Sequence, residues 1–498
     1  MELDANVLAR HAAYHPDRRA AYFRGRWYTY GELYARAHRT ARHLAALGVG
    51  PGDRVGILAH NHLAYLDLFF AAPLVGFALV PYNHRLSAHE LEALVQYTQP
   101  KVLFLGPEMR EKAARLEVPL RPLAALEEEV EAALPAHRPG AEDVALLLFT
   151  GGTTGLPKAA MLPYRQLLVN AFSTVFSWGL FPTDRCVVAT PMFHAALNAL
   201  ATPLLYLGGE VLIQERFDPE EYLEWVEAHR PTLLFMVPTM FQMLIEHPRF
   251  SQTDFSSVRF AISGGAPCPA PVREAFRRVG VRFKQGYGLT ECGVNCFAMD
   301  LEEAEAYPES VGRPVLHLWA RIAREDGSEA DAGEVGELWL SGPVVMRGYF
   351  ARPEETQAVF VAAQGRRWLR TGDLAFRDAA GRYYIVGRKK EMFISGGENV
   401  YPVEVERVLY DHPAVKEAVV VGVPDPKWGE VGLAAVVLRP GARVSAEELR
   451  AFVRARLAAY KVPKRWVFLE ALPKSGAGKV LKREIAERYG GTHAEGQG

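Results

Sequence analysis

Short apolar runs alternate with longer amphipathic segments along most of the chain. The capping box Thr29-x-x-Glu32 starts a helical pattern that continues to HLAALG, and PGDRVGILAHN is then typical of a turn followed by a strand. Farther along, VRFAISGGAP predicts a strand that enters a glycine loop, APVREAFRRVG a helix with proline near its start, and VRFKQGYGLTE another strand and loop. Strands that alternate with helices indicate largely parallel sheets covered by helices on both faces.

The pattern changes after about residue 330. GEVGELWLSGPVVMRGYF and RWLRTGDLAFRDAAGRYYIVGR predict short strands with tight turns, including a hairpin around Ala379 to Gly381. From PVEVERVLYDHPAVKEAVVVGVPDP onward, helices and strands alternate again, and Ser445 to Glu448 forms a second capping box. We therefore place a domain boundary near Lys390.

The expected fold is α/β with two domains. A large N-terminal domain, residues 1–389, should hold helix-covered, largely parallel sheets and a small β-barrel-like region. A smaller α+β C-terminal domain should cover residues 390–489, and the polar, Gly-rich end, residues 490–498, is expected to be disordered. Ligands of parallel sheets bind at loops beyond the carboxyl ends of the strands, which is where the glycine-rich loops of this chain lie.

Composition narrows the class of protein. The chain has 498 residues, 49% of them hydrophobic, and a formal net charge of −1, which gives no support for nucleic-acid or anionic-membrane binding. The charged N-terminus lacks the apolar core of a signal peptide, and the longest apolar stretch, YLDLFFAAPLVGFALVPY, is broken by Asp67 and Pro73. We interpret that stretch as a buried helix and strand, with no transmembrane segment.

The four cysteines are Cys186, Cys268, Cys292 and Cys296. They form no C-x-x-C pair, and the last two have no histidines nearby, so a zinc site is not expected. Reduced thiols in a cytoplasmic protein are the simplest interpretation.

The stretch FTGGTTGLPKAAM, Phe149 to Met161, follows the strand-like run VALLLF. It differs from the P-loop pattern G-x-x-x-x-G-K-S/T, because Lys158 follows Leu-Pro and is itself followed by Ala159. Glycines still let backbone approach a polyanion, while threonine hydroxyls and a lysine can bind phosphate oxygens. A flexible surface turn would explain the glycines but not the threonines and the lysine, so the loop favours phosphate binding.

Three further segments carry candidate chemistry. In QGYGLTE, Tyr287 lies between two glycines and can offer its ring for stacking, and Glu291 is a carboxylate suited to magnesium. Asp373 and Arg388 fall on opposite sides of the predicted hairpin, where they could grip a ribose diol. In PKSGAGKV, Lys479 ends a small flexible loop that could bring it to phosphates. Taken singly, each has an ordinary alternative: a packed tyrosine in a tight turn, surface charges, or a solvated lysine.

Together and in this order, the segments resemble the adenylate-forming acyl-CoA synthetases, the AMP-binding superfamily that also contains luciferases and peptide-synthetase adenylation domains. The resemblance extends from about Tyr28 to near Ile485. It rests on the motifs TGGTTGLPKAAM, PMFHA, SGGAP, QGYGLTE, RTGDLA, GRKKEMFISGGENVYPVEVE and PKSGAGKV.

The resemblance implies a two-step reaction. A carboxylate attacks the ATP α-phosphate to give an acyl-adenylate and pyrophosphate, and the CoA thiol then attacks the acyl carbon and releases AMP. Step one needs no general base, because a carboxylic acid with a pKa of about 4 to 5 is already ionised at pH 7. Catalysis is then positioning plus neutralisation of phosphate charge, in agreement with motifs that are rich in Thr, Lys and Gly.

The resemblance also implies roles for individual residues. Thr290 should contact the α-phosphate, Glu291 should help to hold Mg²⁺, Asp373 should bind the ribose hydroxyls with Arg388 nearby, and Lys479 should reach into the site during adenylation. His194 aligns with the family's histidine between the acyl pocket and the CoA channel. The pyrophosphate side of ATP should be lined by Thr150, Gly151, Gly152, Thr153, Thr154, Gly155 and Lys158. The adenine should be bordered by Gly264, Gly265, Ala266 and Pro267 and by Gln285, Gly286, Tyr287 and Gly288, with Tyr287 stacked on it.

The C-terminal domain is implied to rotate between the two steps. Lys390 falls at the family's hinge, where two basic residues would otherwise mean only a solvated linker. Rotation should withdraw Lys479 and bring the loop that contains Ser395, Gly396, Gly397 and Glu398 to the pantetheine channel.

Three departures from the family's pattern stand out. Gly151 occupies the place of a usual serine, so that one phosphate-facing hydroxyl is missing. Pro163-Tyr164 replaces the common Thr-His or Ser-His, and PMFHAALNAL lacks glycines that often follow the histidine. None of these changes removes an essential charge, so we expect activity.

We therefore expect an ATP-dependent acyl-CoA ligase with ATP, Mg²⁺ and CoA as cofactor and co-substrates, acting on a small-molecule carboxylic acid. PDPKWGEVGLAAVVL resembles the CoA-forming branch, and the apolar run LLFMVPTMFQMLI favours a medium- or long-chain fatty acid and a place in lipid metabolism. The alternatives are an aryl or succinylbenzoate-type CoA ligase, an acyl-AMP ligase that loads a carrier protein, and a nucleotide-binding regulator without chemistry. The sequence does not give the oligomeric state, and a homodimer is one assembly to test.

Overall fold

The computed structural model describes residues 6–150, 156–194, 197–474 and 480–491. The chain divides into two compact units. The first unit contains Met1–Pro267, Phe276–Ala320 and Leu340–Leu369, and the second contains Cys268–Ala275, Arg321–Trp339 and Arg370–Gly498.

One seven-stranded sheet of the first unit has the order β13-β12-β11-β9-β10-β1-β2. Its neighbours pair in parallel except for β1 and β2, which form an antiparallel hairpin. The strands are β1 (Arg19–Phe23), β2 (Arg26–Thr29), β9 (Arg185–Val188), β10 (Glu210–Ile213), β11 (Leu233–Met236), β12 (Phe260–Ser263) and β13 (Phe283–Gln285).

A second seven-stranded sheet has the order β18-β8-β7-β4-β3-β5-β6. Its central strands are parallel, whereas β8 is antiparallel to both β7 and β18. The strands are β3 (Arg54–Leu58), β4 (Ala78–Pro81), β5 (Val102–Leu105), β6 (Leu120–Pro122), β7 (Val144–Thr150), β8 (Lys158–Pro163) and β18 (Gly348–Tyr349). Both sheets confirm the expected, largely parallel α/β organisation.

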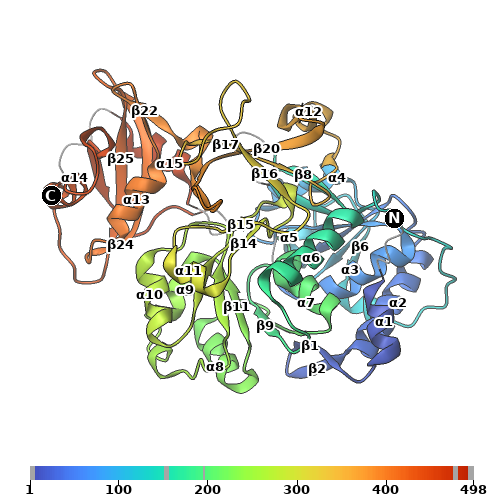
Figure 1. Ribbon diagram of the computed structural model, residues 1–498. Coiled ribbons are helices and arrows are strands. Elements are labelled where there is room, and N and C mark those ends of the chain that lie inside the picture. Colours follow the sequence, from blue (N-terminus) through green and yellow to red (C-terminus); the bar gives the residue numbers. More distant parts are fainter. Residues whose placement is uncertain (1–5, 151–155, 195–196, 475–479, 492–498) are drawn as a thin grey trace. The chain divides into compact units, whose positions relative to one another are not determined.

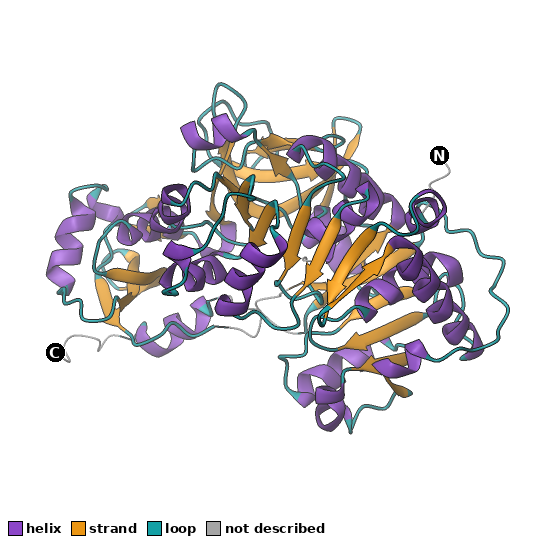
Figure 2. Cartoon of the chain, turned by 90° about the horizontal axis from the view of Figure 1, so that it is seen from below, coloured by secondary structure: helices purple, strands orange, loops and turns teal. Residues whose placement is uncertain are grey.

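Helices lie on either side of these strands (Figure 2). Helix α2 (Tyr30–Ala46) starts at the predicted capping box, in which the Thr29 side chain accepts from the Glu32 N–H and Glu32 accepts from the Thr29 N–H. Helix α3 (Ala64–Val75) is buried along most of its length and leads into β4, as predicted for the apolar stretch. The unit also contains α1 (Val7–Tyr14), α4 (Ala88–Thr98), α5 (Arg110–Ala113), α6 (Tyr164–Trp178), the π-helix η3 (Leu197–Ala201), α7 (Thr202–Leu207), α8 (Pro219–His229), α9 (Pro238–Glu246), β14 (Phe297–Ala298), α11 (Leu301–Ala306), β15 (Arg313–Pro314) and α12 (Pro353–Val359); α10 (Ala270–Arg278) follows β12.

The predicted hairpin around Ala379 to Gly381 is present. Strands β20 (Arg366–Arg377) and β21 (Tyr383–Arg388) pair antiparallel, with Asp373 opposite Arg388. A third sheet has the order β16-β17-β20-β19, with β21 paired to β20. Its other strands are β16 (Trp319–Ala323), β17 (Gly336–Ser341) and β19 (Phe360–Ala363).

The C-terminal part of the second unit, orange to red in Figure 1, is built on a sheet with the order β23-β22-β25-β24, with β26 parallel to β25. Alternate residues of β24 face opposite sides: Val420 packs in a cluster with Leu409 of α13 and Leu449 of α14, whereas Val421 packs in a cluster with Ile485 of α15. The elements are β22 (Phe393–Ser395), β23 (Glu398–Val400), α13 (Pro402–Tyr410), β24 (Val415–Asp425), β25 (Gly429–Leu438), α14 (Ala446–Arg454), β26 (Arg465–Phe468) and α15 (Lys482–Tyr489).

This region agrees with the α+β expectation in class but corrects the expected alternation. Strands β24 and β25 follow each other directly as an antiparallel hairpin, with no helix between them. The predicted capping box of Ser445 and Glu448 starts α14. The compact units divide the chain at other positions and do not test the predicted domain boundary at Lys390. That boundary therefore stays a prediction.

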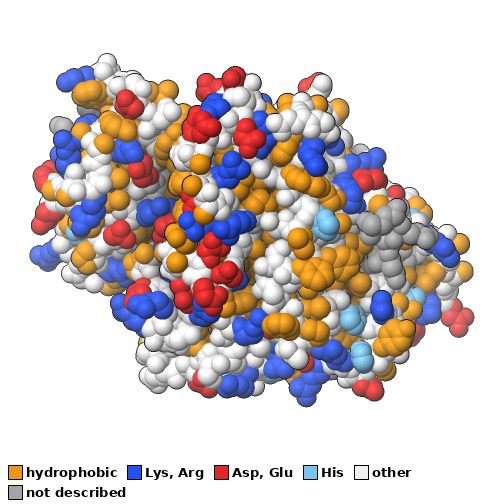
Figure 3. Space-filling model, viewed as in Figure 1, with side chains coloured by type: hydrophobic (Ala, Val, Ile, Leu, Met, Phe, Trp, Pro, Cys, Tyr) orange, Lys and Arg blue, Asp and Glu red, His pale blue; other side chains and the backbone are white. Residues whose placement is uncertain are grey.

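Basic and acidic side chains are interspersed on the face of the molecule in Figure 3, in line with a net charge of −1. All four cysteines lie among the described residues, and each is a buried thiol outside any disulfide. Across the described ranges, no helix has the length and apolarity that crossing a bilayer requires.

Candidate active site

The first glycine loop connects the two strands of a hairpin. Strands β7 and β8 pair so that Thr150 lies opposite Lys158, and the Thr150 hydroxyl is 3.4 Å from the Lys158 carbonyl oxygen that accepts its hydrogen bond. A P-loop instead leads from a strand into a helix, whose N-terminus helps to bind phosphate. The predicted phosphate-binding residues Gly151, Gly152, Thr153, Thr154 and Gly155 lie outside the described residues.

The second and third glycine segments leave neighbouring strands. Ser263 at the end of β12 pairs with Gln285 at the end of β13, so that the strip Gly264, Gly265, Ala266 and Pro267 starts beside the strip Gly286, Tyr287 and Gly288. The Gly286 N–H donates to the Ser263 carbonyl at 2.7 Å. A Cβ on Gly288 would lie 2.1 Å from the Val294 carbonyl oxygen, so this backbone approach requires glycine.

Tyr287 is partly buried rather than fully covered. Its ring meets the edge of Phe297 at a centroid distance of 5.6 Å, and its carbonyl accepts from the Cys296 N–H at 3.0 Å. The amide of Gln285 donates to the Pro308 carbonyl at 3.2 Å. The loop is therefore fixed at both ends around the ring.

Thr290 and Glu291 form a short 3-10 turn after this loop, Thr290–Cys292. Thr290 is 6% exposed, and its carbonyl accepts from the side-chain amide of Gln166 at 3.1 Å. The Glu291 carbonyl accepts from the Met346 N–H at 2.8 Å, and its carboxylate Oε1 accepts from the hydroxyl of Tyr349 at 3.0 Å. No motif in the sequence pointed to Gln166 or Tyr349.

The donor set at Glu291 fits magnesium. Mg²⁺ prefers oxygen ligands and commonly takes one or two carboxylates together with substrate phosphates and waters. Glu291 supplies a partly exposed carboxylate, and within the described residues no lysine or arginine forms an ion pair with it. Glu291 is thus the residue that would hold the ion, which would bridge and neutralise phosphate oxygens.

His194 is partly buried, and its backbone N–H donates to the Pro191 carbonyl at 3.1 Å. The segment before it is held by Asn61, whose Oδ1 accepts from the Met192 N–H at 2.7 Å and whose Nδ2 donates to the Thr190 carbonyl at 3.1 Å. Asn61 is 4% exposed. This positioning residue was also missed, because it lies far from PMFHA in the sequence.

In the second unit, Asp373 and Arg388 meet as predicted for their hairpin. The Arg388 Nε lies 2.7 Å from Asp373 Oδ1, and Asp373 is 4% exposed. A cavity of about 360 Å³ is lined by Thr371, Gly372, Arg388, Lys389 and Lys390. Burial of Lys390, and then the neighbouring Arg388 guanidinium, lowers the pKa of its ammonium group.

The loop from Ser395 to Glu398 is the tip of the β22–β23 hairpin. Gly396 and Gly397 have φ angles of 62° and 89°, a left-handed conformation that favours glycine. The Gly396 N–H donates to the Trp428 carbonyl at 3.0 Å. Lys479 lies outside the described residues.

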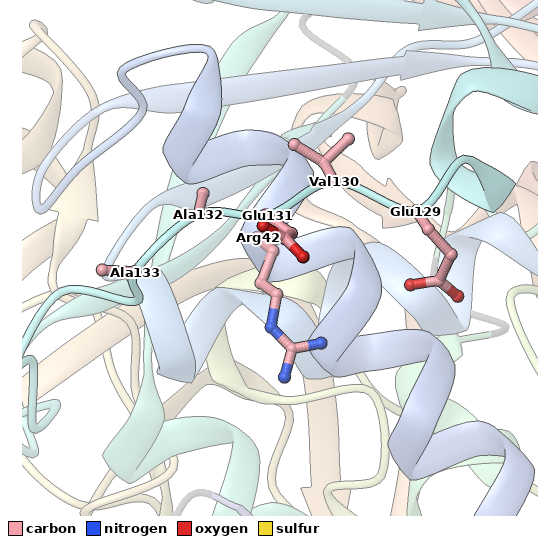
Figure 4. Close-up of a pocket in the computed structure, with 6 residues that line it drawn as sticks. All are labelled: Arg42, Glu129, Val130, Glu131, Ala132 and Ala133. Carbon is pink, nitrogen blue, oxygen red and sulfur yellow. The ribbon is translucent and has the colours of Figure 1, made fainter.

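A larger hollow, about 810 Å³, contains none of the predicted site residues. Arg42 projects from α2, and the rest of the lining, Glu129 to Ala133, follows one extended segment (Figure 4). This mixture of exposed charges and small side chains offers no constellation typical of catalysis.

Comparisons with known proteins agree with this geometry. The model of the AMP-binding enzyme family matches residues 8–350, and that of the AMP-binding enzyme C-terminal domain matches residues 404–479. The chain belongs to the AMP-binding enzyme family.

Several relatives that match nearly the whole chain are CoA ligases or CoA synthases. A feruloyl-CoA synthase of Amycolatopsis sp is 42% identical over 97% of this chain and 98% of the relative, and a long-chain-fatty-acid–CoA ligase of Bacillus subtilis is 33% identical over 98% and 95%. The o-succinylbenzoate CoA synthetase of Bacillus subtilis, solved with its acyl-adenylate intermediate, has a TM-score of 0.89 at 32% identity and covers 98% of this chain and 99% of that one. The same enzyme has also been solved with ATP and a magnesium ion.

These findings confirm the predicted acyl-CoA synthetase branch of the adenylate-forming superfamily. They also confirm the enzyme class, an AMP-forming acid–thiol ligase, and the set of ATP, Mg²⁺ and CoA. The predicted medium- or long-chain fatty acid is not confirmed, since the relatives include ligases of aromatic acids.

Proposed function

We propose that this enzyme activates an aromatic carboxylic acid of the hydroxycinnamate type as its acyl-adenylate and transfers the acyl group to CoA. The observation that carries the choice of acid is the identity of 42% with feruloyl-CoA synthases along 97% of the chain. Sequence motifs alone leave an aryl acid as an alternative to a fatty acid. This similarity makes the aryl acid the stronger candidate substrate.

Residues of the first unit carry the phosphate and adenine contacts of the proposed adenylation step. The Thr150–Lys158 hairpin binds the pyrophosphate side of ATP, Thr290 contacts the α-phosphate, and Glu291 holds Mg²⁺. Tyr287 stacks on the adenine, beside the strip from Gly264 to Pro267 and together with Gln285, Gly286 and Gly288. The substrate carboxylate is ionised at neutral pH, so these groups position it and offset charge without acting as a base.

The remaining roles concern the nucleoside and the second step. Asp373 accepts from the ribose hydroxyls, with Arg388 holding its carboxylate, and Lys479 serves adenylation. The C-terminal domain then rotates at Lys390 and brings the loop from Ser395 to Glu398 to the CoA channel. His194 is assigned to the passage between the acyl pocket and that channel. A cytoplasmic location and a homodimer remain parts of the proposal.

A fatty acid is the second candidate. It is supported by the 33% identity with the long-chain-fatty-acid–CoA ligase of Bacillus subtilis over 98% of this chain. The apolar segment LLFMVPTMFQMLI, which includes α9, agrees with it, although such a segment also serves as ordinary core.

A carboxylate panel tests the choice. Ferulate, cinnamate, o-succinylbenzoate, octanoate and palmitate are each supplied with ATP, Mg²⁺ and CoA, while pyrophosphate release and thioester formation are measured. We expect kcat/KM for ferulate to exceed that for octanoate and palmitate at least tenfold. A preference for palmitate would replace the aromatic acid by the second candidate. Pyrophosphate release without CoA thioester would instead indicate a carrier-protein acceptor.

A further inference from the structure

Tyr349 touches two residues that belong to different phosphate-site motifs. Its hydroxyl donates to Glu291 Oε1 at 3.0 Å, and the Nζ of Lys158 lies over its ring, 4.9 Å from the centroid. Glu291 comes from the QGYGLTE segment and Lys158 from the first glycine loop. One side chain therefore contacts both the carboxylate suited to Mg²⁺ and the lysine suited to pyrophosphate.

The backbone at Tyr349 is held by several contacts, and the residue is nearly buried. Tyr349 is 7% exposed, and its N–H donates to the Thr356 hydroxyl at 2.9 Å. Strand β18 pairs with β8, so Tyr349 lies opposite Ala160, two residues beyond Lys158. A Cβ on Gly348 would lie 2.7 Å from the Thr356 methyl, so glycine at this position allows the helix that follows to pack closely. These contacts fix the backbone from which the side chain presents its hydroxyl to Glu291.

The two contacts have distinct physical effects. A neutral hydroxyl orients a carboxylate through one oxygen and leaves its charge uncompensated, whereas a lysine or arginine in that place would compete with a metal ion. An aromatic face attracts an ammonium group without neutralising it, so the charge of Lys158 also stays available to an anion. Both contacts prepare charged groups for a ligand rather than pairing them with each other.

We propose that Tyr349 is a positioning residue for magnesium–nucleotide binding: its hydroxyl aims the Glu291 carboxylate at the ion and its ring supports Lys158 toward the pyrophosphate. The proposal rests on the proposed function, since it takes ATP and Mg²⁺ as the ligands. It adds a residue that none of the family motifs quoted above contains.

Calorimetric titration of ATP at a series of Mg²⁺ concentrations, without acid or CoA, tests the role apart from turnover. Tyr349→Phe keeps the ring and loses the hydroxyl. We expect the Mg²⁺ concentration that gives half-maximal ATP affinity to rise about three- to tenfold, while affinity at saturating Mg²⁺ changes less than twofold. Tyr349→Leu also removes the face below Lys158, so ATP affinity should fall further, even at saturating Mg²⁺.

Tyr97→Phe is a matched control. The Tyr97 hydroxyl donates to the carbonyl of Phe350, the residue next to Tyr349, and has no contact with Glu291 among the interactions of the described residues. This variant should keep the wild-type Mg²⁺ dependence, and thermal unfolding of all three variants reports whether the fold is intact.

Wild-type Mg²⁺ dependence in folded Tyr349→Phe would overturn the proposal, and so would an equal shift in Tyr97→Phe, which would indicate general loosening. Failure of the wild-type enzyme to bind ATP with Mg²⁺ would instead count against the proposed function. The two failures are therefore distinguishable.

Discussion

Two buried or partly buried carboxylates, Glu291 in the first unit and Asp373 in the second, are held by opposite kinds of partner. Glu291 receives the neutral hydroxyl of Tyr349, whereas Asp373 pairs with the Arg388 guanidinium at 2.7 Å. A carboxylate whose charge the protein leaves uncompensated can attract a cation from solution. One that already has an arginine is better suited to accept hydrogen bonds from hydroxyl groups.

A similar contrast exists between two further sets of contacts. Next to Glu291 the side-chain amide of Gln166, a neutral group, donates to the Thr290 carbonyl. Elsewhere in the second unit partly buried charges meet: Lys482 Nζ lies 2.9 Å from Glu391 and 3.1 Å from Glu406. We therefore expect metal binding at Glu291 to depend on neutral polar groups, and the stability of the second unit to depend on its charges.

The largest effect is expected from Glu291→Gln. The amide keeps the size of the side chain but cannot bind Mg²⁺ as a carboxylate does, so kcat for pyrophosphate release should fall about 10²- to 10³-fold at millimolar Mg²⁺. Raising the Mg²⁺ concentration should recover part of the loss, and initial rates across a Mg²⁺ series measure this.

Asp373→Asn is the matched change in the second unit. It should weaken nucleotide binding about tenfold and leave the half-saturating Mg²⁺ concentration unchanged, because Arg388 already compensates the charge. Equal Mg²⁺ shifts in the two variants would remove the distinction between the carboxylates.

The next effect concerns stability. Burial by itself would lower the pKa of Lys482, but the carboxylates of Glu406 and Glu391 more than offset this and raise it. Lys482→Met leaves both carboxylates uncompensated and should cost about 3 kcal/mol of unfolding free energy, measured by urea denaturation.

Arg483→Met provides the control for that variant. Arg483 and Glu487 form an i,i+4 pair in which both side chains are more than half exposed, 68% and 61%. Its loss should cost less than about 0.5 kcal/mol. Similar losses of unfolding free energy in the two variants would show that the charge cluster around Lys482 stabilises the second unit no more than an exposed ion pair does.

Local relations in this molecule could be predicted from sequence, and long-range ones could not. The Thr29–Glu32 capping box and the Asp373–Arg388 pair depend on spacing within one helix start or one hairpin, so the pattern of residues specified them. Tyr349 and Glu291 are 58 residues apart, and Asn61 and Met192 are 131 apart. Such contacts depend on how strands are ordered in a sheet, which local patterns do not encode.

Acid should weaken the first unit through its neutral histidines. Burial, and then the charge of Arg24, lowers the pKa of His62 to about 4, and its Nδ1 accepts from the Ala64 N–H at 3.1 Å. A folded-state pKa below the unfolded value gives stability that is present above about pH 6.5 and is lost as the pH falls toward 4. For His62 this amounts to about 2 kcal/mol between pH 7 and pH 5.

His62→Asn tests this pH dependence of stability, because an amide oxygen can accept the hydrogen bond from the Ala64 N–H without titrating. Urea midpoints at pH 7 and pH 5 should differ less in the variant than in the wild type. Part of the pH dependence of stability should remain in the variant, because burial also lowers the pKa of His84 to about 4. An unchanged pH dependence would exclude His62 as a source of acid sensitivity.

The smallest effect should have the opposite sign. Asn198, in the π-helix after His194, is 7% exposed, and neither of its amide atoms finds a hydrogen-bond partner in the described part of the chain. A buried amide without a partner costs stability, so the similarly shaped Asn198→Leu should gain about 1 kcal/mol in urea unfolding. Asn170→Leu is the control, because Asn170 donates to the Asn295 carbonyl at 2.9 Å and loss of this hydrogen bond should destabilise the protein.

A residue that lowers stability beside a candidate site often has a functional role, and π-helices often occur at functional positions. If Asn198 contacts the acid, the stabilised variant should discriminate less between ferulate and cinnamate in kcat/KM. A destabilised Asn198→Leu would instead place Asn198 among the satisfied polar groups of the first unit.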